Sequence, residues 1–114
     1  MEEKVVYKSE YKNAPQSALK LRLIADVIRG KNAQWAVDQL ELLNKKGAKL
    51  VKKALKSAIA NAKLLDGIEA EELIVEKILV NEARGFKKVY FSARGRASRL
   101  NRRRSHIYIE LIKK

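Results

Sequence analysis

Apolar residues recur along this chain with two different spacings. Across 19–28 and 51–65 they return every three or four residues, which is the period of an amphipathic helix. Across 107–111 they alternate with polar residues, as in a strand with one buried face. The pattern therefore predicts helices in the middle of the chain and strands in its last third.

The first helix is predicted from about Pro15 to Arg29. Proline is favourable in a first turn because its missing N–H has no partner there, and Gly30 suits the residue after a helix. Its polar residues form only a narrow stripe, so we expect a mostly buried helix. Its apolar face carries Leu21, Ile24, Ala25 and Ile28, widened by Leu19, Leu23 and Val27.

Two more helices are predicted at about 33–43 and 46–65. Asn32 is a suitable N-cap for the second helix, and Asp66-Gly67 ends the third. Trp35 falls opposite the apolar face, and we expect it to pack on a neighbouring helix or loop. On the third helix an apolar face that includes Leu65 lies opposite lysines, interpreted as a solvated surface. These are Lys45, Lys49, Lys52, Lys56 and Lys63.

Strands are predicted at about 5–11, 73–80 and 106–112, and the last two enclose a basic segment. That segment has the pattern of a long hairpin, because Val89, Tyr90 and Phe91 favour a strand and a Gly-containing turn follows. The predicted fold class is α+β, with three helices packed on a small three-stranded antiparallel sheet and a long basic β-hairpin extension. We expect one domain, 1–114, with a body of about 1–82 and 105–114 and a hairpin of about 83–104.

Positive charge is concentrated in the hairpin. Residues 83–109 hold nine Lys or Arg and no Asp or Glu, so they carry +9 of the net charge of +13. A two-stranded ribbon projecting about 30 Å is marginal in water, and a polyanionic partner would complete it. Nucleic acid is the first candidate, since seven of the nine are arginine, whose guanidinium suits phosphates and stacks on bases.

Patterns for catalysis and metal binding are absent from the sequence. There is no cysteine, and the one histidine, His106, has no recognisable acidic partner, which favours a structural or RNA-contacting role. Gly95-Arg96 lacks the spacing of a phosphate-binding loop, and no apolar run approaches the roughly 20 residues of a membrane span. We expect a cytoplasmic protein that is not an enzyme and has no cofactor or metal.

The competing classes are a free-standing RNA chaperone or DNA-compacting protein and, more weakly, a membrane-active protein. Composition does not separate a free binder from a protein built into a ribonucleoprotein particle. The uneven charge favours the second class, because a free binder needs a basic groove on its body whereas this charge lies on an extension. The basic stretch also lacks the amphipathic helical stripe of a membrane-active segment.

Three stretches of the chain resemble the bacterial form of the large-subunit ribosomal protein twenty-two family. They are SALKLRLIADVIRGK at 17–31, NKKGAKLVKKALKSAIANA at 44–62 and ARGRASRLNRRRSHI at 93–107. The resemblance implies three helices on a small antiparallel sheet, with a hairpin that reaches through large-subunit rRNA to line the polypeptide exit tunnel. It implies a structural protein that contacts several rRNA domains and supports subunit assembly.

The resemblance also implies partners and site residues. The partners are large-subunit rRNA, neighbouring large-subunit ribosomal proteins and the nascent polypeptide, with macrolide antibiotics nearby. The tunnel-lining tip is Ser92, Ala93, Arg94 and Gly95. The implied rRNA-binding residues are Lys20, Arg22, Arg29, Lys31, Lys87, Lys88, Arg94, Arg96, Arg99, Arg102, Arg103, Arg104 and His106.

The outgoing arm departs from the common family pattern at two places. Asn81-Glu82-Ala83-Arg84 stands where many members have Asp-Glu-Gly-Pro, and Phe91-Ser92 replaces a usual Pro-Arg. Ser92 thus stands in place of the family's arginine, and we expect the ring of Phe91 beside it to stack where that guanidinium normally would.

Overall fold

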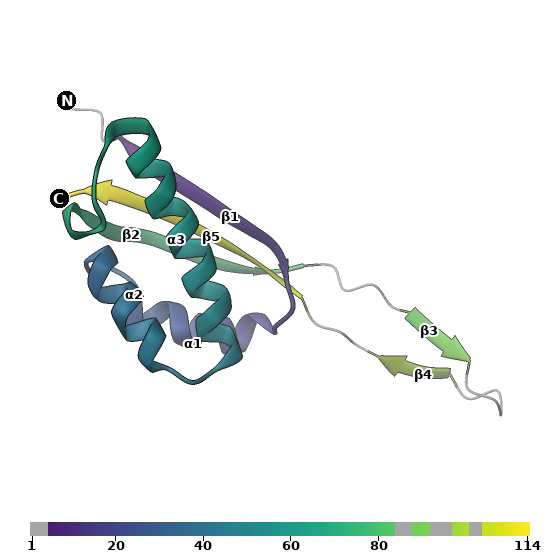
Figure 1. The fold of residues 1–114 in the computed structure, drawn as a ribbon. Helices are drawn as coiled ribbons and strands as arrows, with labels where there is room; N and C mark the ends of the chain where they lie inside the picture. The colour runs from purple at the N-terminus through teal and green to yellow at the C-terminus, as the bar shows by residue number, and fades with distance from the viewer. Residues whose placement is uncertain (1–4, 84–87, 92–96, 101–103) are drawn as a thin grey trace.

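The computed structural model describes residues 5–83, 88–91, 97–100 and 104–114. Three helices and a three-stranded antiparallel sheet form the body, which confirms the predicted α+β class (Figure 1). In chain order the elements are β1 (Val6–Ala14), α1 (Ala18–Ile28), α2 (Ala33–Leu42), α3 (Lys46–Asp66), the 3-10 turn η1 (Ala70–Glu72), β2 (Leu73–Glu82), β3 (Lys88–Phe91), β4 (Ala97–Leu100) and β5 (Ser105–Lys113).

The C-terminal strand β5 lies in the middle of the sheet, between β1 and β2. It pairs antiparallel with both, with Ile109 opposite Ser9 on one side and Ile78 on the other. Alternate residues of β5 point to the helices, so Ile107, Ile109 and Leu111 are fully buried. The sheet that sequence alternation predicts is therefore confirmed, and its centre is the last strand of the chain.

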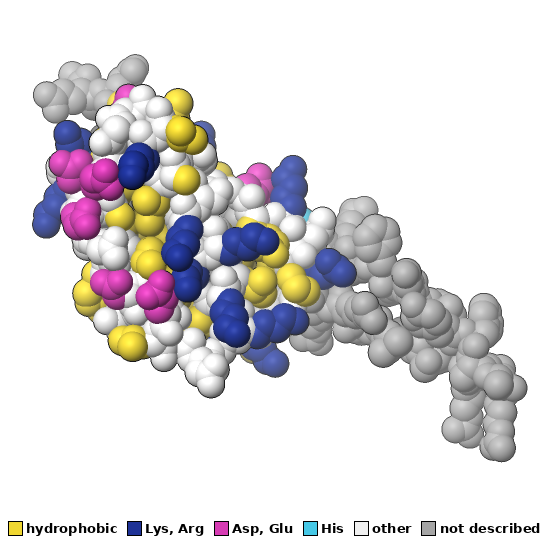
Figure 2. Space-filling view, viewed as in Figure 1, with side chains coloured by type: hydrophobic (Ala, Val, Ile, Leu, Met, Phe, Trp, Pro, Cys, Tyr) yellow, Lys and Arg dark blue, Asp and Glu magenta, His cyan; other side chains and the backbone are white. Residues whose placement is uncertain are grey.

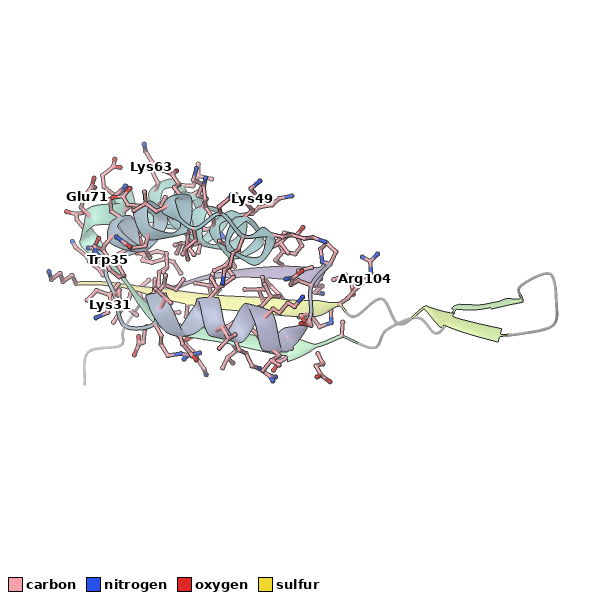
Figure 3. All side chains as sticks on the ribbon, turned by 90° about the horizontal axis from the view of Figure 1, so that it is seen from below. Lys31, Trp35, Lys49, Lys63, Glu71 and Arg104 are labelled. Atoms are coloured by element: carbon pink, nitrogen blue, oxygen red, sulfur yellow. The ribbon has the colours of Figure 1, made fainter. Side chains whose placement is uncertain are left out.

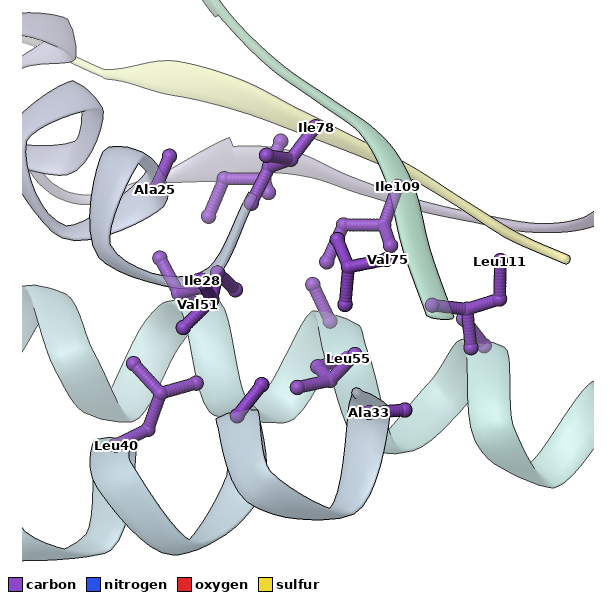
Figure 4. Packing of buried hydrophobic residues seen from close by; sticks show 14 of the residues in the cluster. Ala25, Ile28, Ala33, Leu40, Val51, Leu55, Val75, Ile78, Ile109 and Leu111 are labelled. Carbon is purple, nitrogen blue, oxygen red and sulfur yellow. The ribbon is translucent and has the colours of Figure 1, made fainter. Parts of the chain in front are cut away.

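The helices cover one face of this sheet, and the core lies between the two layers (Figure 4). Helix α1 contacts β2, α3 contacts β1 and β5, and α2 packs on α3. Helix α3 also approaches α1 closely, because a Cβ added at Gly47 would lie 2.5 Å from Cδ1 of Ile24. The helical residues labelled in this core are Ala25, Ile28, Ala33, Leu40, Val51 and Leu55.

Helix ends follow the predicted signals with one exception. The Asn32 side chain accepts hydrogen bonds from the N–H groups of Gln34 and Trp35, and Gly67 ends α3 with φ of 66°. The predicted start of α1 at Pro15 is wrong, because β1 continues to Ala14 and the next residues form a turn before Ala18. In that turn the N–H of Gln16 donates to the carbonyl of Ala14.

The prediction that α1 is mostly buried is also wrong. Leu19, Leu23 and Val27 are 69 %, 66 % and 44 % exposed, since β2 and α3 cover only the opposite side of this helix. Leu65 was expected in the core and is 73 % exposed. It lies in the last turn of α3, after Ala62, the last buried residue of that helix.

The hairpin prediction is confirmed for the residues that the structure describes. Strands β3 and β4 pair antiparallel from Lys88 opposite Leu100 to Phe91 opposite Ala97. The N–H of Ala83 donates to the carbonyl of Arg104, which extends the pairing of β2 and β5 to the hairpin base. Figure 1 places β3 and β4 beyond that end of the sheet.

Candidate nucleic-acid interface

Two of the predicted RNA-binding arginines, Arg22 on α1 and Arg29 at its C-cap, hold this helix along the outer edge of β2. Arg22 donates from Nε and Nη2 to the carbonyl of Val80, at 3.1 and 2.9 Å. Arg29 donates from Nη2 to the carbonyl of Ile78 at 3.0 Å and forms an ion pair with Asp26. The guanidinium groups therefore satisfy carbonyls that an edge strand leaves unpaired.

The α1–α2 turn completes this cover of the β2 edge. The N–H of Gly30 donates to the carbonyl of Val75, and the N–H of Val75 donates back to the carbonyl of Lys31. Gly30 has φ of 78°, a conformation that glycine adopts without strain. The turn thereby fixes the position of the two predicted RNA-binding residues beside it, Arg29 and Lys31.

Lys20 and Lys31 are exposed cations at opposite ends of α1. The ammonium group of Lys31 lies 5.9 Å from the centroid of the Trp35 ring, which is 41 % exposed on α2. The Lys31 ammonium thus lies over part of the Trp35 ring, and the packing of Trp35 on a neighbouring helix or loop stays a prediction. Figure 3 shows Lys31 and Trp35 near each other at the end of the body away from the hairpin.

A cluster at the hairpin base joins the start of β5 to the turn after β1. Nδ1 of His106 accepts a hydrogen bond from the N–H of Asn13 at 3.1 Å, and Nη1 of Arg104 donates to the carbonyl of Asn13 at 3.3 Å. Ser105 is fully buried and donates to the carbonyl of Gln16 at 2.9 Å. Asn13 has φ of 59°, where the regular pairing of β1 with β5 is interrupted.

Two side chains of this cluster keep hydrogen-bond donors that are not used within it. A neutral imidazole that accepts at Nδ1 carries its proton on Nε2, so His106 retains one N–H donor for an external acceptor. The Arg104 guanidinium likewise retains donors beyond the one given to Asn13. Asn13, Gln16 and Ser105 were not predicted from the sequence, because their contacts join backbone atoms of Asn13 and Gln16 to side chains about 90 residues away in the chain.

The remaining predicted site residues lie in the hairpin. Lys88 is in β3 and Arg99 in β4, where it pairs with Val89. The tip predicted at Ser92–Gly95 lies outside the described residues. So do five of the predicted RNA-binding residues: Lys87, Arg94, Arg96, Arg102 and Arg103.

Acidic side chains on the described body lie mostly at the end away from the hairpin (Figure 2). Figure 2 shows Lys and Arg over α3 and towards the hairpin, with most Asp and Glu of this view on the far half. Figure 3 places Glu71 at that far end and Arg104 at the hairpin base. The sequence predicts that the lysines of α3 form a solvated surface. One signal for a larger role was available, since no acid occurs between Glu41 and Asp66.

The described residues contain no group of three or more His, Cys, Asp or Glu positioned to hold a metal ion. Within the same residues, no helix has the length and apolar character needed to cross a bilayer.

In this protein two adjacent strands of a basic α+β body continue into a basic hairpin, which is typical of structural proteins that bind a polyanion. The arginine-rich hairpin suits RNA. The family model for ribosomal protein L22p/L17e matches residues 9–112, and the chain belongs to this family. It is accordingly a large-subunit ribosomal protein that binds rRNA, in the cytoplasmic ribosome, with rRNA and other ribosomal proteins as partners. The family is one of structural proteins.

Proposed function

We propose that this protein supports assembly of the large subunit by binding several rRNA domains, lines the polypeptide exit tunnel with its hairpin tip, and has no catalytic activity. The whole chain acts as one domain in this proposal. The observation that carries it is the junction of body and hairpin. The paired strands β2 and β5 continue into Ala83 and Arg104, and Asn13 and Gln16 tie the start of β5 to the body.

A hairpin joined in this way has its first residues fixed by the sheet. Ser105 is buried and His106 half-buried in the body, so the hairpin arm that ends at Arg104 joins the body at a defined position. Pre-ordering the base reduces the entropy lost when the basic ribbon binds RNA. This supports a role in which the arms lie between rRNA segments and hold them at a fixed distance from the body.

The body contacts of the proposal are made by Lys20, Arg22, Arg29 and Lys31, and the base contact by His106. Arg22 uses two of its five N–H donors on Val80, so Nη1 remains for a phosphate. One guanidinium can then bind a backbone carbonyl inside the protein and an RNA phosphate outside it. The β2 carbonyls would orient the side chain before RNA arrives.

The tunnel role rests on the composition of the tip. Ser92, Ala93 and Gly95 are small, and Arg94 is the one charged residue among them. Small residues allow a tight turn and leave space for the nascent polypeptide. The anchoring cations, Arg99 and 102–104, lie further back on the returning arm. Tip and arm should therefore have separable functions, with macrolide binding nearby affected through the tip.

Two variants test this division. Arg94→Glu should change nascent-chain pausing or the macrolide response while a tagged copy still sediments with large subunits. The triple change Arg102→Glu, Arg103→Glu and Arg104→Glu should impair incorporation, because repulsion replaces several phosphate contacts. Both are measured on the same particles by sedimentation and by pausing. Equal loss of incorporation would refute the division of roles, and failure of the wild-type chain to sediment with large subunits would refute the function itself.

A further inference from the structure

Seven lysines lie outside the buried face of α3: Lys45 at its N-cap, then Lys46, Lys49, Lys52, Lys53, Lys56 and Lys63. Three of them have acidic partners. Lys52 and Lys56 lie 3.4 and 3.9 Å from Oε1 of Glu41, and Lys63 lies 3.7 Å from Oε1 of Glu69. Within the described part of the chain, the other four form no salt bridge with Asp or Glu. We call these four, Lys45, Lys46, Lys49 and Lys53, the α3 lysine row.

The α3 lysine row is electrostatically unfavourable for the protein alone. Lys45, Lys49 and Lys53 are spaced four residues apart, so they follow one another along one helix face at intervals of about 6 Å. Like charges at this spacing repel and destabilise a helix. The first turn of α3 also contains no acidic residue to offset them. A bound polyanion would relieve this repulsion.

The row leads towards the hairpin base. The Lys53 ammonium lies 5.3 Å from the centroid of the Tyr11 ring, which is half-buried on β1. Two residues further on, Asn13 is held by Arg104 and His106. Figure 2 shows Lys and Arg side chains over α3 and on towards the hairpin, and Figure 3 shows Lys49 pointing away from the sheet.

We propose that the α3 lysine row binds the phosphate backbone of an RNA double helix, as a body contact separate from α1 and from the hairpin. The inference rests on the proposed function and adds a site to it. Lysine is a compact charge that binds phosphate without the planar fork of arginine, which fits positioning on a backbone and not reading of bases. A single strand would need exposed stacking faces, whereas the ring beside the row, Tyr11, is half-buried and lies under the Lys53 ammonium.

The test compares two full-length variants that lose the same charge. Lys49→Gln with Lys53→Gln removes half of the row. Lys63→Gln with Lys113→Gln is the matched control, since both of its lysines are exposed and Lys63 is already paired. The probe is a plain RNA duplex of about 20 base pairs, titrated by filter binding at several salt concentrations. Circular dichroism checks that both variants keep their helices.

The row variant should bind the duplex about 20-fold more weakly than wild type at 0.1 M salt, with a salt slope shallower by about 1.5, because two phosphate contacts are lost. The control should stay within about threefold of wild type. Equal weakening of both variants would mean that only net charge matters, and no weakening would mean that the row is a solvated surface. Either result overturns the site.

Sedimentation of the same two variants with large subunits separates this inference from the proposed function. Normal duplex binding by the row variant combined with poor incorporation would assign the row to a protein partner and overturn the RNA site. If the wild-type and control chains incorporate into large subunits normally, the proposed function stands whatever the row variant does.

Discussion

At the scale of single residues, Arg22 has a structural role that its charge alone does not reveal. Its two hydrogen bonds to the carbonyl of Val80 join α1 to the edge of β2. Replacing Arg22 with Lys keeps the charge and removes the planar pair of donors, so we expect a loss of about 1 kcal/mol in the free energy of unfolding. Urea unfolding measures this loss.

The matched control for Arg22 is Lys20→Ala on the same helix. Lys20 is exposed and makes no hydrogen bond within the described residues, so its replacement should change stability by less than about 0.5 kcal/mol. Equal effects of the two variants would show that the Val80 contact does not stabilise the body.

Tyr7 gives the protein a pH-dependent contribution to stability. The Tyr7 hydroxyl donates to the Asp66 carboxylate, and this hydrogen bond, helped by burial, raises the pKa of Tyr7 above its ordinary value. A raised folded pKa adds stability that is complete below pH 10 and lost as pH rises through the folded value. As the pH rises above about 10, the free energy of unfolding should therefore fall less for Tyr7→Phe than for the wild-type protein.

Unfolding free energies measured by urea between pH 8 and pH 11 test this prediction. Asp66→Asn removes the carboxylate that raises the pKa, so it should also flatten the alkaline loss. Parallel pH curves for wild type and both variants would contradict it.

At the scale of elements, the hairpin and the body are expected to be separable. Strands β2 and β5 pair from Leu73 opposite Lys113 to Glu82 opposite Ser105. Every residue of the described hydrophobic core lies outside the hairpin. Replacing 84–103 with Asn-Gly should therefore leave a tight turn between Ala83 and Arg104 and a folded body. Circular dichroism and urea unfolding should show nearly unchanged helix content and midpoint.

The comparison for the shortened chain is Ile109→Ala in the full-length protein. Ile109 is fully buried at the centre of the sheet, so this change should cost about 3 kcal/mol. A shortened chain that loses its helices would mean that the hairpin arms belong to the core.

At the scale of the whole molecule, the net charge of +13 makes RNA binding dependent on salt. If six to eight phosphates are neutralised, log K for rRNA against log salt should have a slope on the order of −5. The variant without 84–103 lacks eight Lys or Arg and should show a much shallower slope. Filter binding measures both, and a wild-type slope near zero would reject electrostatic recognition as the main contribution.

Much of this fold could be predicted from the sequence because its signals are local. The helix cap at Asn32, the left-handed end at Gly67 and the alternation in β5 each depend on residues within a few positions of one another. The concentration of charge in the hairpin and the family resemblance are likewise properties of the sequence, and the family match over residues 9–112 confirms the resemblance.

Only the tertiary structure decided which side of each helix is covered and what each cation contacts. Periodicity marks an apolar stripe on α1 but does not limit its width, and β2 and α3 leave Leu19 and Leu23 exposed. Arg22 and Arg29 find their carbonyl acceptors 58 and 49 residues away, on a strand whose edge position follows from the order β1-β5-β2. Contacts between distant segments depend on how the elements pack, and the spacing of residues along the chain does not encode that packing.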